Sequence, residues 1–198
     1  MSPDTRDLLV EAAARLLDEG GVEGVTLREV GRMAGVSHNA PYKHFPSKQA
    51  LLAAVAARDL ARESAAVTAQ IPPAAPPEQA LRLVLRHYAG WALRYPARFK
   101  LAFGAWQAAY PELDQAAHDA QAMLAGLVAA AQETGTLPAG DPERLAALLR
   151  ALAHGAADLA SAGHLAPDGK GHAGPGDLID DMLRYLRQAA PSARARIP

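Results

Sequence analysis

Apolar residues recur along most of the chain at intervals of three and four, which is the spacing of one face of an α-helix. The first such stripe comprises Leu9, Ala12, Ala13, Leu16 and Leu17. The glycine pair at residues 20 and 21 is expected to end that helix. No stretch alternates apolar and polar residues as a half-buried strand does. The pattern therefore predicts an all-α protein of about nine helices.

Prolines mark the main break in this pattern. Four of the six residues from 72 to 77 are prolines, which prevents a continuous helix there. We therefore expect three short N-terminal helices within residues 1–46 and a connecting helix at 47–70. A larger helical domain would cover residues 71–190, and a disordered tail would cover 191–198.

The segment from Thr26 to Lys48 predicts two short helices joined by a tight turn. Thr26 and Glu29 have the spacing of a capping box, so a helix is expected to begin at Thr26. Gly35 is placed to form the turn, and Ser37 or His38 to cap a second helix. Two short helices around a glycine-containing turn are typical of a helix-turn-helix, whose second helix enters the major groove of DNA.

The second of these helices carries side chains suited to DNA. They are polar, aromatic or small, and they comprise His38, Asn39, Ala40, Tyr42, Lys43 and His44. Between residues 26 and 48, four Arg and Lys residues stand against one carboxylate, a net charge of +3, whereas the whole chain carries −1. Lys48 is expected in the first turn of the next helix, where the helix dipole disfavours a cation unless a phosphate binds there.

Each of these interpretations has a structural alternative. Asn39 could act only as a helix cap, and Tyr42 could be a core aromatic residue. Lys43 and Lys48 could be solvated charges, which is the usual state of lysine. Arg32 is interpreted as solvated.

Residues 8–55 resemble the TetR family of bacterial transcription regulators. The resemblance rests on GVTLREV at 24–30, AGVS at 34–37, YKHF at 42–45 and SKQALL at 47–52. The run SHNAPYKHF and the later His154-Gly155 are most similar to the subgroup with a WHG-type C-terminal domain. Pro41 departs from the family, because most members carry an aliphatic residue there.

The resemblance implies residue roles and an assembly. The N-terminal domain would be a three-helix helix-turn-helix DNA-binding domain, and the C-terminal helical domain would bind ligand and dimerise. Backbone phosphates would be held by Thr26, Arg28, Ser37, Tyr42 and Lys48. Bases would face His38, Asn39, Lys43 and His44. Phe45 would be buried between helices. The last two helices, 141–162 and 177–190, would form the homodimer interface, with contacts that include Leu149, Ala153, Ala156, Met182 and Leu186.

Aromatic residues are sparse but cluster between residues 88 and 106. This clustering is equally consistent with ordinary core filling and with an apolar ligand pocket. The predicted ligand-binding residues are His87, Tyr88, Trp91, Phe99, Phe103, Trp106, Gln107, His118, Met123 and His154. The expected effector is small, neutral or weakly charged, and largely apolar.

Composition excludes several other classes. Without cysteine the chain can form neither disulfides nor thiolate metal sites. The histidines lack ligand spacing, so neither a metal nor a cofactor is expected. No signal peptide or membrane span is recognisable, which favours a cytoplasmic location. The sequence contains no catalytic constellation. We therefore expect a homodimeric repressor that binds an inverted-repeat operator as double-stranded DNA. The alternatives are a constitutive activator or architectural DNA binder without ligand, and an enzyme or ligand carrier with an incidental helix-turn-helix.

Overall fold

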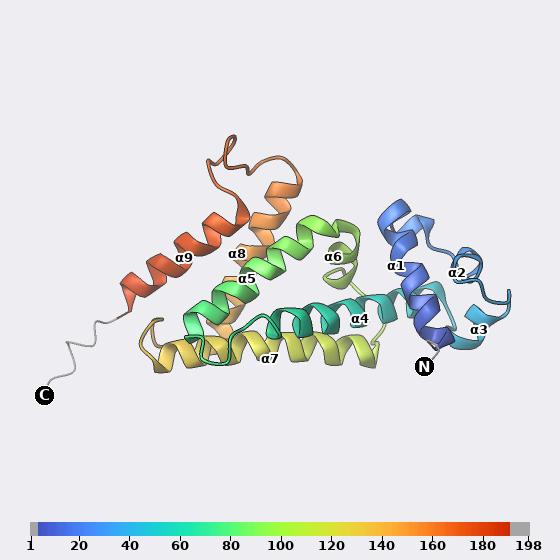
Figure 1. Ribbon diagram of the computed structural model, residues 1–198, viewed down its shortest axis with the longest axis horizontal. Helices are drawn as coiled ribbons and strands as arrows, with labels where there is room; N and C mark the ends of the chain where they lie inside the picture. Colours follow the sequence, from blue (N-terminus) through green and yellow to red (C-terminus); the bar gives the residue numbers. More distant parts are fainter. Residues whose placement is uncertain (1–3, 191–198) are drawn as a thin grey trace, which may run out of the picture. The chain divides into compact units, whose positions relative to one another are not determined.

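A computed structural model describes residues 4–190 of the chain, so the predicted tail at 191–198 lies outside the described residues. Within that range the chain forms nine α-helices and no strand, which confirms the predicted fold class (Figure 1). The helices are α1 (Thr5–Gly24), α2 (Leu27–Met33), α3 (Ala40–His44), α4 (Lys48–Thr68), α5 (Pro77–Arg94), α6 (Pro96–Ala102), α7 (Pro111–Glu133), α8 (Pro142–Ser161) and α9 (Pro175–Ala189). None of these helices combines the length and apolar character that crossing a membrane requires.

Local signals in the sequence set several helix ends. Asp141 caps α8, because its carboxylate accepts hydrogen bonds from the N–H groups of Glu143 and Arg144 at 3.0 and 3.4 Å. The Asp177 carboxylate accepts from the Gly174 N–H at 2.7 Å where α9 begins. Gly21 breaks the helical geometry of α1 with φ 63° and ψ −166°, yet α1 continues to Gly24. The prediction that the glycine pair ends this helix was therefore only partly right.

The described chain divides into two compact units. The first contains residues up to Arg62 together with Tyr95–His118. Its core is built by α1, α2 and α4 around Leu9, Leu17, Val30 and Leu51. Side chains of α6 and of the segment after it pack against this core, namely Ala97, Leu101 and Trp106. The core that supports α2 and α3 therefore extends beyond the N-terminal helices.

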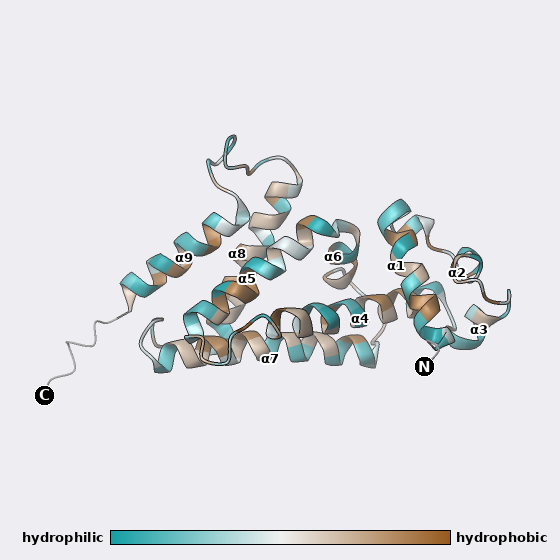
Figure 2. Cartoon of the chain, viewed as in Figure 1, coloured by the Kyte–Doolittle hydropathy of each residue, from teal (hydrophilic) through white to brown (hydrophobic). Residues whose placement is uncertain are grey.

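The second unit contains residues 63–94 and those from Asp119 onward. Here α5 packs against α8 and α9, and α8 packs against α9. Leu81 and Leu85 of α5, Leu149 of α8, and Ile179 and Leu183 of α9 are fully buried. Teal and brown positions alternate along α9 because only one of its faces is apolar (Figure 2).

Candidate DNA-binding interface

The turn between α2 and α3 depends on two glycines. Gly35 has φ +66°, a left-handed conformation that glycine adopts without steric cost. The Val36 N–H then donates to the Gly31 carbonyl at 3.1 Å and closes the end of α2. Gly31 is buried, and a Cβ atom added to it would lie only 2.9 Å from Cγ of Pro41. Helices α2 and α3 therefore approach each other more closely than a larger residue at position 31 allows.

Helix α3 begins later than predicted, at Ala40 instead of Ser37, and its cap residue is Asn39. The expectation that Ser37 or His38 caps α3 was wrong, because these residues form a turn in which the Ala40 N–H donates to the Ser37 carbonyl at 2.9 Å. The Asn39 side chain makes no capping hydrogen bond, and its Oδ1 lies 3.3 Å from Nδ1 of His38. Its amide is therefore not used to cap the helix.

Most of the predicted DNA-binding residues are exposed on α2, α3 and the turn between them. The exposed set is Thr26, Arg28, Ser37, His38, Asn39, Tyr42, Lys43 and His44, whereas Ala40 and Lys48 are half-buried. Tyr42 is 53% exposed, so it is no core aromatic residue, and its ring lies 5.8 Å from that of His38. Phe45 is buried, as expected.

The charges on this surface are not balanced. Arg32 is exposed and donates hydrogen bonds to the Glu29 carboxylate, which lower the pKa of that carboxyl below its usual value. Arg28, Lys43 and Lys48 form no ion pair with any residue in the described range. The single carboxylate of the segment is thus neutralised, and three cations remain for an anionic partner.

Two helix starts offer donors next to these cations. The Thr26 oxygen accepts from the Glu29 N–H at 3.1 Å, which leaves the hydroxyl proton of Thr26 able to donate outward. The predicted capping box is therefore half formed. Thr26 caps the helix, but the Glu29 carboxylate pairs with Arg32. The Ser47 hydroxyl accepts from the Ala50 N–H at 3.1 Å and caps α4 immediately before Lys48. A helix start flanked by a lysine is a favourable site for a phosphate group.

A partly buried ionic network joins three helices of the first unit. Arg98 of α6 donates to Asp18 of α1 at 2.9 Å and lies 3.8 Å from the carboxylate of Asp59 in α4. Arg58 pairs with the same Asp59 at 2.6 Å and with Glu11 of α1 at 2.9 Å. Burial alone would lower the pKa of Arg98, but the hydrogen bond with Asp18 and the charge of Asp59 raise it overall. No pattern in the sequence indicated this network.

The predicted ligand-binding residues fall into both units. In the second unit the Tyr88 hydroxyl lies 2.8 Å from Nδ1 of His154, and Nε2 of His87 lies 2.7 Å from Glu63. Burial raises the pKa of the Tyr88 hydroxyl far above its usual range. Trp91 is buried, and the Thr68 hydroxyl lies 3.5 Å from the sulfur of Met123.

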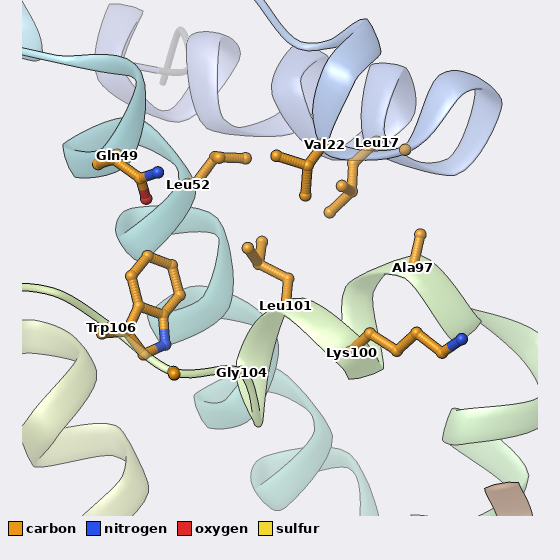
Figure 3. Close-up of a pocket in the computed structure, with 11 residues that line it drawn as sticks. Leu17, Val22, Gln49, Leu52, Ala97, Lys100, Leu101, Gly104 and Trp106 are labelled. Atoms are coloured by element: carbon orange, nitrogen blue, oxygen red, sulfur yellow. The ribbon is translucent and has the colours of Figure 1, made fainter.

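The remaining predicted ligand-binding residues belong to the first unit. The rings of Phe99 and Phe103 are 4.8 Å apart, and Gln107 and His118 are exposed. Helix α6 ends at Ala102, so Trp106 lies in the non-helical segment before α7. It lines a cavity together with residues of α1 and α4 (Figure 3).

The residues predicted for the dimer interface differ in exposure. Leu149, Ala153 and Ala156 are buried within the single chain, whereas Met182 and Leu186 are half-buried. The exposed large apolar side chains of α8 and α9 are Leu148, Leu159 and Tyr185.

Comparison with known protein families gives two matches along the chain. Residues 9–55 match the model for bacterial regulatory proteins of the tetR family, and residues 81–186 match the model for the tetracyclin repressor-like C-terminal domain. Together with the helix-turn-helix geometry, they define a DNA-binding transcription regulator and not an enzyme. The chain belongs to the TetR family.

Individual relatives agree with this result. The chain is 39% identical to tetracycline repressor protein class D of Escherichia coli over 57 residues, which are 29% of this chain and 26% of that protein. A structure of a protein of unknown function from Rhodococcus sp. RHA1 is 30% identical and has a TM-score of 0.80, with 95% of this chain and 96% of the other covered. The structure of AibR in complex with isovaleryl coenzyme A and operator DNA shares the fold, at 19% identity and a TM-score of 0.64 over 92% and 98% of the two chains.

Proposed function

We propose that this protein is a homodimeric repressor that binds an inverted-repeat operator and is released from it by a small, largely apolar effector. The observation that carries the proposal is the surface formed by α2, α3 and the start of α4, where Glu29 is neutralised by Arg32 while Arg28, Lys43 and Lys48 remain unpaired among the described residues. Two such surfaces are needed because one short recognition helix makes few contacts, and paired half-sites normally lie about one helical turn of DNA apart. A reporter gene behind the operator tests repression directly, since deletion of the regulator should raise its expression.

The proposed effector site in the second unit is supported by the polar pair Tyr88 and His154 and by the buried Trp91 of the same unit. A few polar groups among apolar walls are typical of a small-molecule pocket. AibR, which shares the fold, was crystallised with both an acyl coenzyme A and operator DNA. The WHG-type assignment, based on His154-Gly155, stays a prediction.

Replacing Lys48 with alanine is expected to weaken binding to all DNA sequences alike. Lys48 is proposed to contact a phosphate, so its loss should reduce the slope of log K against log salt concentration by about 0.9. Fluorescence anisotropy with operator and random duplexes over a salt series measures both quantities. The matched control is Lys170→Ala, which removes the same charge from an exposed loop outside the helix-turn-helix. An unchanged salt slope in Lys48→Ala would contradict the phosphate contact.

Replacing Asn39 with alanine is expected to reduce base preference at one position of each half-site. Its side chain does not cap α3, so the amide can form a paired hydrogen bond with adenine. Loss of such a contact should reduce discrimination at that position by about 1 to 3 kcal/mol, with little change for random DNA. Binding to a set of operators with single base changes measures this. A uniform loss across all duplexes would instead indicate that Asn39 serves the fold of α3.

The proposed dimer surface must differ from the residues first selected on α8. Leu149, Ala153 and Ala156 already fill the core of their own chain and have almost no surface left for a second copy. Leu148 is 61% exposed, and Leu159 is exposed three helical turns further along the same face. We therefore place the contacts on Leu148 and Leu159 of α8, with Met182, Tyr185 and Leu186 of α9.

A charged residue on this surface should shift the protein toward monomer. Leu148→Glu would bury a carboxylate in the proposed interface and weaken the dimer by at least about 1.4 kcal/mol, or tenfold. Light scattering over a concentration series gives the mass, which is 20.7 kDa for one chain. Leu93→Glu is the matched control, because Leu93 is an exposed leucine on α5. A wild-type mass near that of one chain at micromolar concentration would contradict the homodimer itself.

A further inference from the structure

The first unit contains a cavity of about 400 Å³ that is separate from the proposed effector site. Its walls come from α1, α4, α6 and the segment that follows α6 (Figure 3). Most of the lining is apolar, with Leu17 and Val22 from α1, Leu52 from α4 and Leu101 from α6. A volume of this size lies within the range of small-molecule pockets.

The polar groups of this cavity are few, and they include an unused donor. Nε1 of Trp106 is buried and has no hydrogen-bond acceptor among the described residues. A buried N–H group without an acceptor is unfavourable, so an oxygen atom placed beside it would gain a hydrogen bond that the protein does not provide. Figure 3 shows this nitrogen on the edge of the indole ring nearest Gly104.

The charge of the lining selects among possible ligands. Lys100 is the one charged residue of the lining, and no carboxylate contributes to it. Lys100 and Trp106 lie on opposite sides of Leu101, and the Lys100 side chain runs outward, away from Leu101 (Figure 3). A cation at the rim favours an anionic ligand and disfavours an amine. Gln49 adds an amide group that can donate or accept.

We propose that this cavity binds a small apolar molecule with oxygen acceptors, and that monocarboxylates are preferred over amines of the same size. The residues that carry the proposal are Trp106, Lys100 and the apolar side chains around Leu101. Because α1 and α4 also support the helix-turn-helix, a molecule bound here contacts the DNA-binding unit directly. The proposal does not depend on operator binding, and it is tested without DNA.

The test uses three probes that share one tail, namely octanoate, 1-octanol and octylamine. The full chain with Trp91→Phe retains Trp106 as its single tryptophan, so emission reports on the cavity. Octanoate is expected to change this emission saturably with a Kd of about 1 mM or lower, and octylamine to bind several-fold more weakly. Calorimetry on the wild-type protein provides a second measurement that does not depend on the Trp91 substitution. If octanoate produces no saturable signal by either method, the proposal is wrong.

Two substitutions locate the binding. Ala97→Leu should fill the cavity from α6 and weaken octanoate binding at least roughly tenfold, whereas Ala122→Leu, at an exposed position of α7, should not change it. Lys100→Met should weaken octanoate binding roughly threefold and leave 1-octanol unchanged. Lys100 is exposed, so this variant is expected to fold even if Ala97→Leu does not. Octanoate binding that neither Ala97→Leu nor Lys100→Met changes would show that the molecule binds elsewhere, and the assignment would fail.

Discussion

Replacing Gly31 with alanine should destabilise the protein by about 2 to 3 kcal/mol and weaken operator binding at least roughly tenfold. The added methyl group would lie 2.9 Å from Cγ and 3.4 Å from Cδ of Pro41, so the ring must move. Pro41 lies within α3, and its displacement would shift the exposed side chains of α3 relative to α2. Thermal unfolding gives the loss of stability, and fluorescence anisotropy gives the loss of affinity.

The Gly31 prediction has a control and a compensating change. Gly126→Ala introduces the same methyl group into α7, where no atom lies within 4 Å, and should stabilise the protein by about 0.5 to 1 kcal/mol. Pro41→Ala removes both contacting carbons, so it should restore much of what Gly31→Ala loses. The two substitutions should therefore show a favourable coupling energy in a double-mutant cycle. Additive effects would mean that the Pro41 ring is not the obstacle.

Replacing Arg98 with methionine should lower the free energy of unfolding by about 3 to 5 kcal/mol. Asp59 is only 3% exposed, and Arg98 supplies part of the positive charge around it as well as the hydrogen bond to Asp18. A buried carboxylate that loses a cationic partner is strongly destabilising, whereas methionine keeps most of the packing of the arginine stem. Urea unfolding at neutral pH measures the difference.

Arg86→Met is the matched control for this network. Arg86 also pairs with an aspartate, Asp180, at 2.7 Å, but its side chain is far more exposed than that of Arg98. Exposed pairs contribute about 0 to 1 kcal/mol, so this control should change stability little. Equal losses in the two variants would show that Arg98 contributes no more than a surface ion pair.

The helix-turn-helix was predictable because its signals are local. Thr26 caps α2 and Gly35 adopts the left-handed turn, and both follow from residue types at short spacing. The burial of Phe45 was implied by the family resemblance. The start of α3 was less predictable. Ser37 and Asn39 are both good cap residues, and the structure uses Asn39, which puts Pro41 in the first turn of α3.

The candidate sites beyond residue 70 were less predictable because they depend on packing between distant segments. Leu148 and Leu149 are adjacent residues of the same type, yet in α8, which packs against α5 and α9, Leu149 is buried and Leu148 is exposed. Clustering in sequence likewise suggested one aromatic pocket. The structure instead assigns Trp91 and Trp106 to different units, because the chain passes between the units after Arg94. Periodicity reports an apolar face, but not which partner covers it.

The way α6 completes the first unit has a consequence for making chimeras. The proline-rich segment from 72 to 77 is the natural place to join the DNA-reading half of one regulator to the effector-sensing half of another. A junction there would separate Leu101 and Trp106 from the core against which they pack. It would also separate Arg98 from its partner Asp18 in α1. The transferred DNA-binding helices would then pack against an α6 that comes from the other regulator. If residues 95–118 are transferred together with the DNA-binding helices, the core and the charge pairs of the first unit all come from the same regulator.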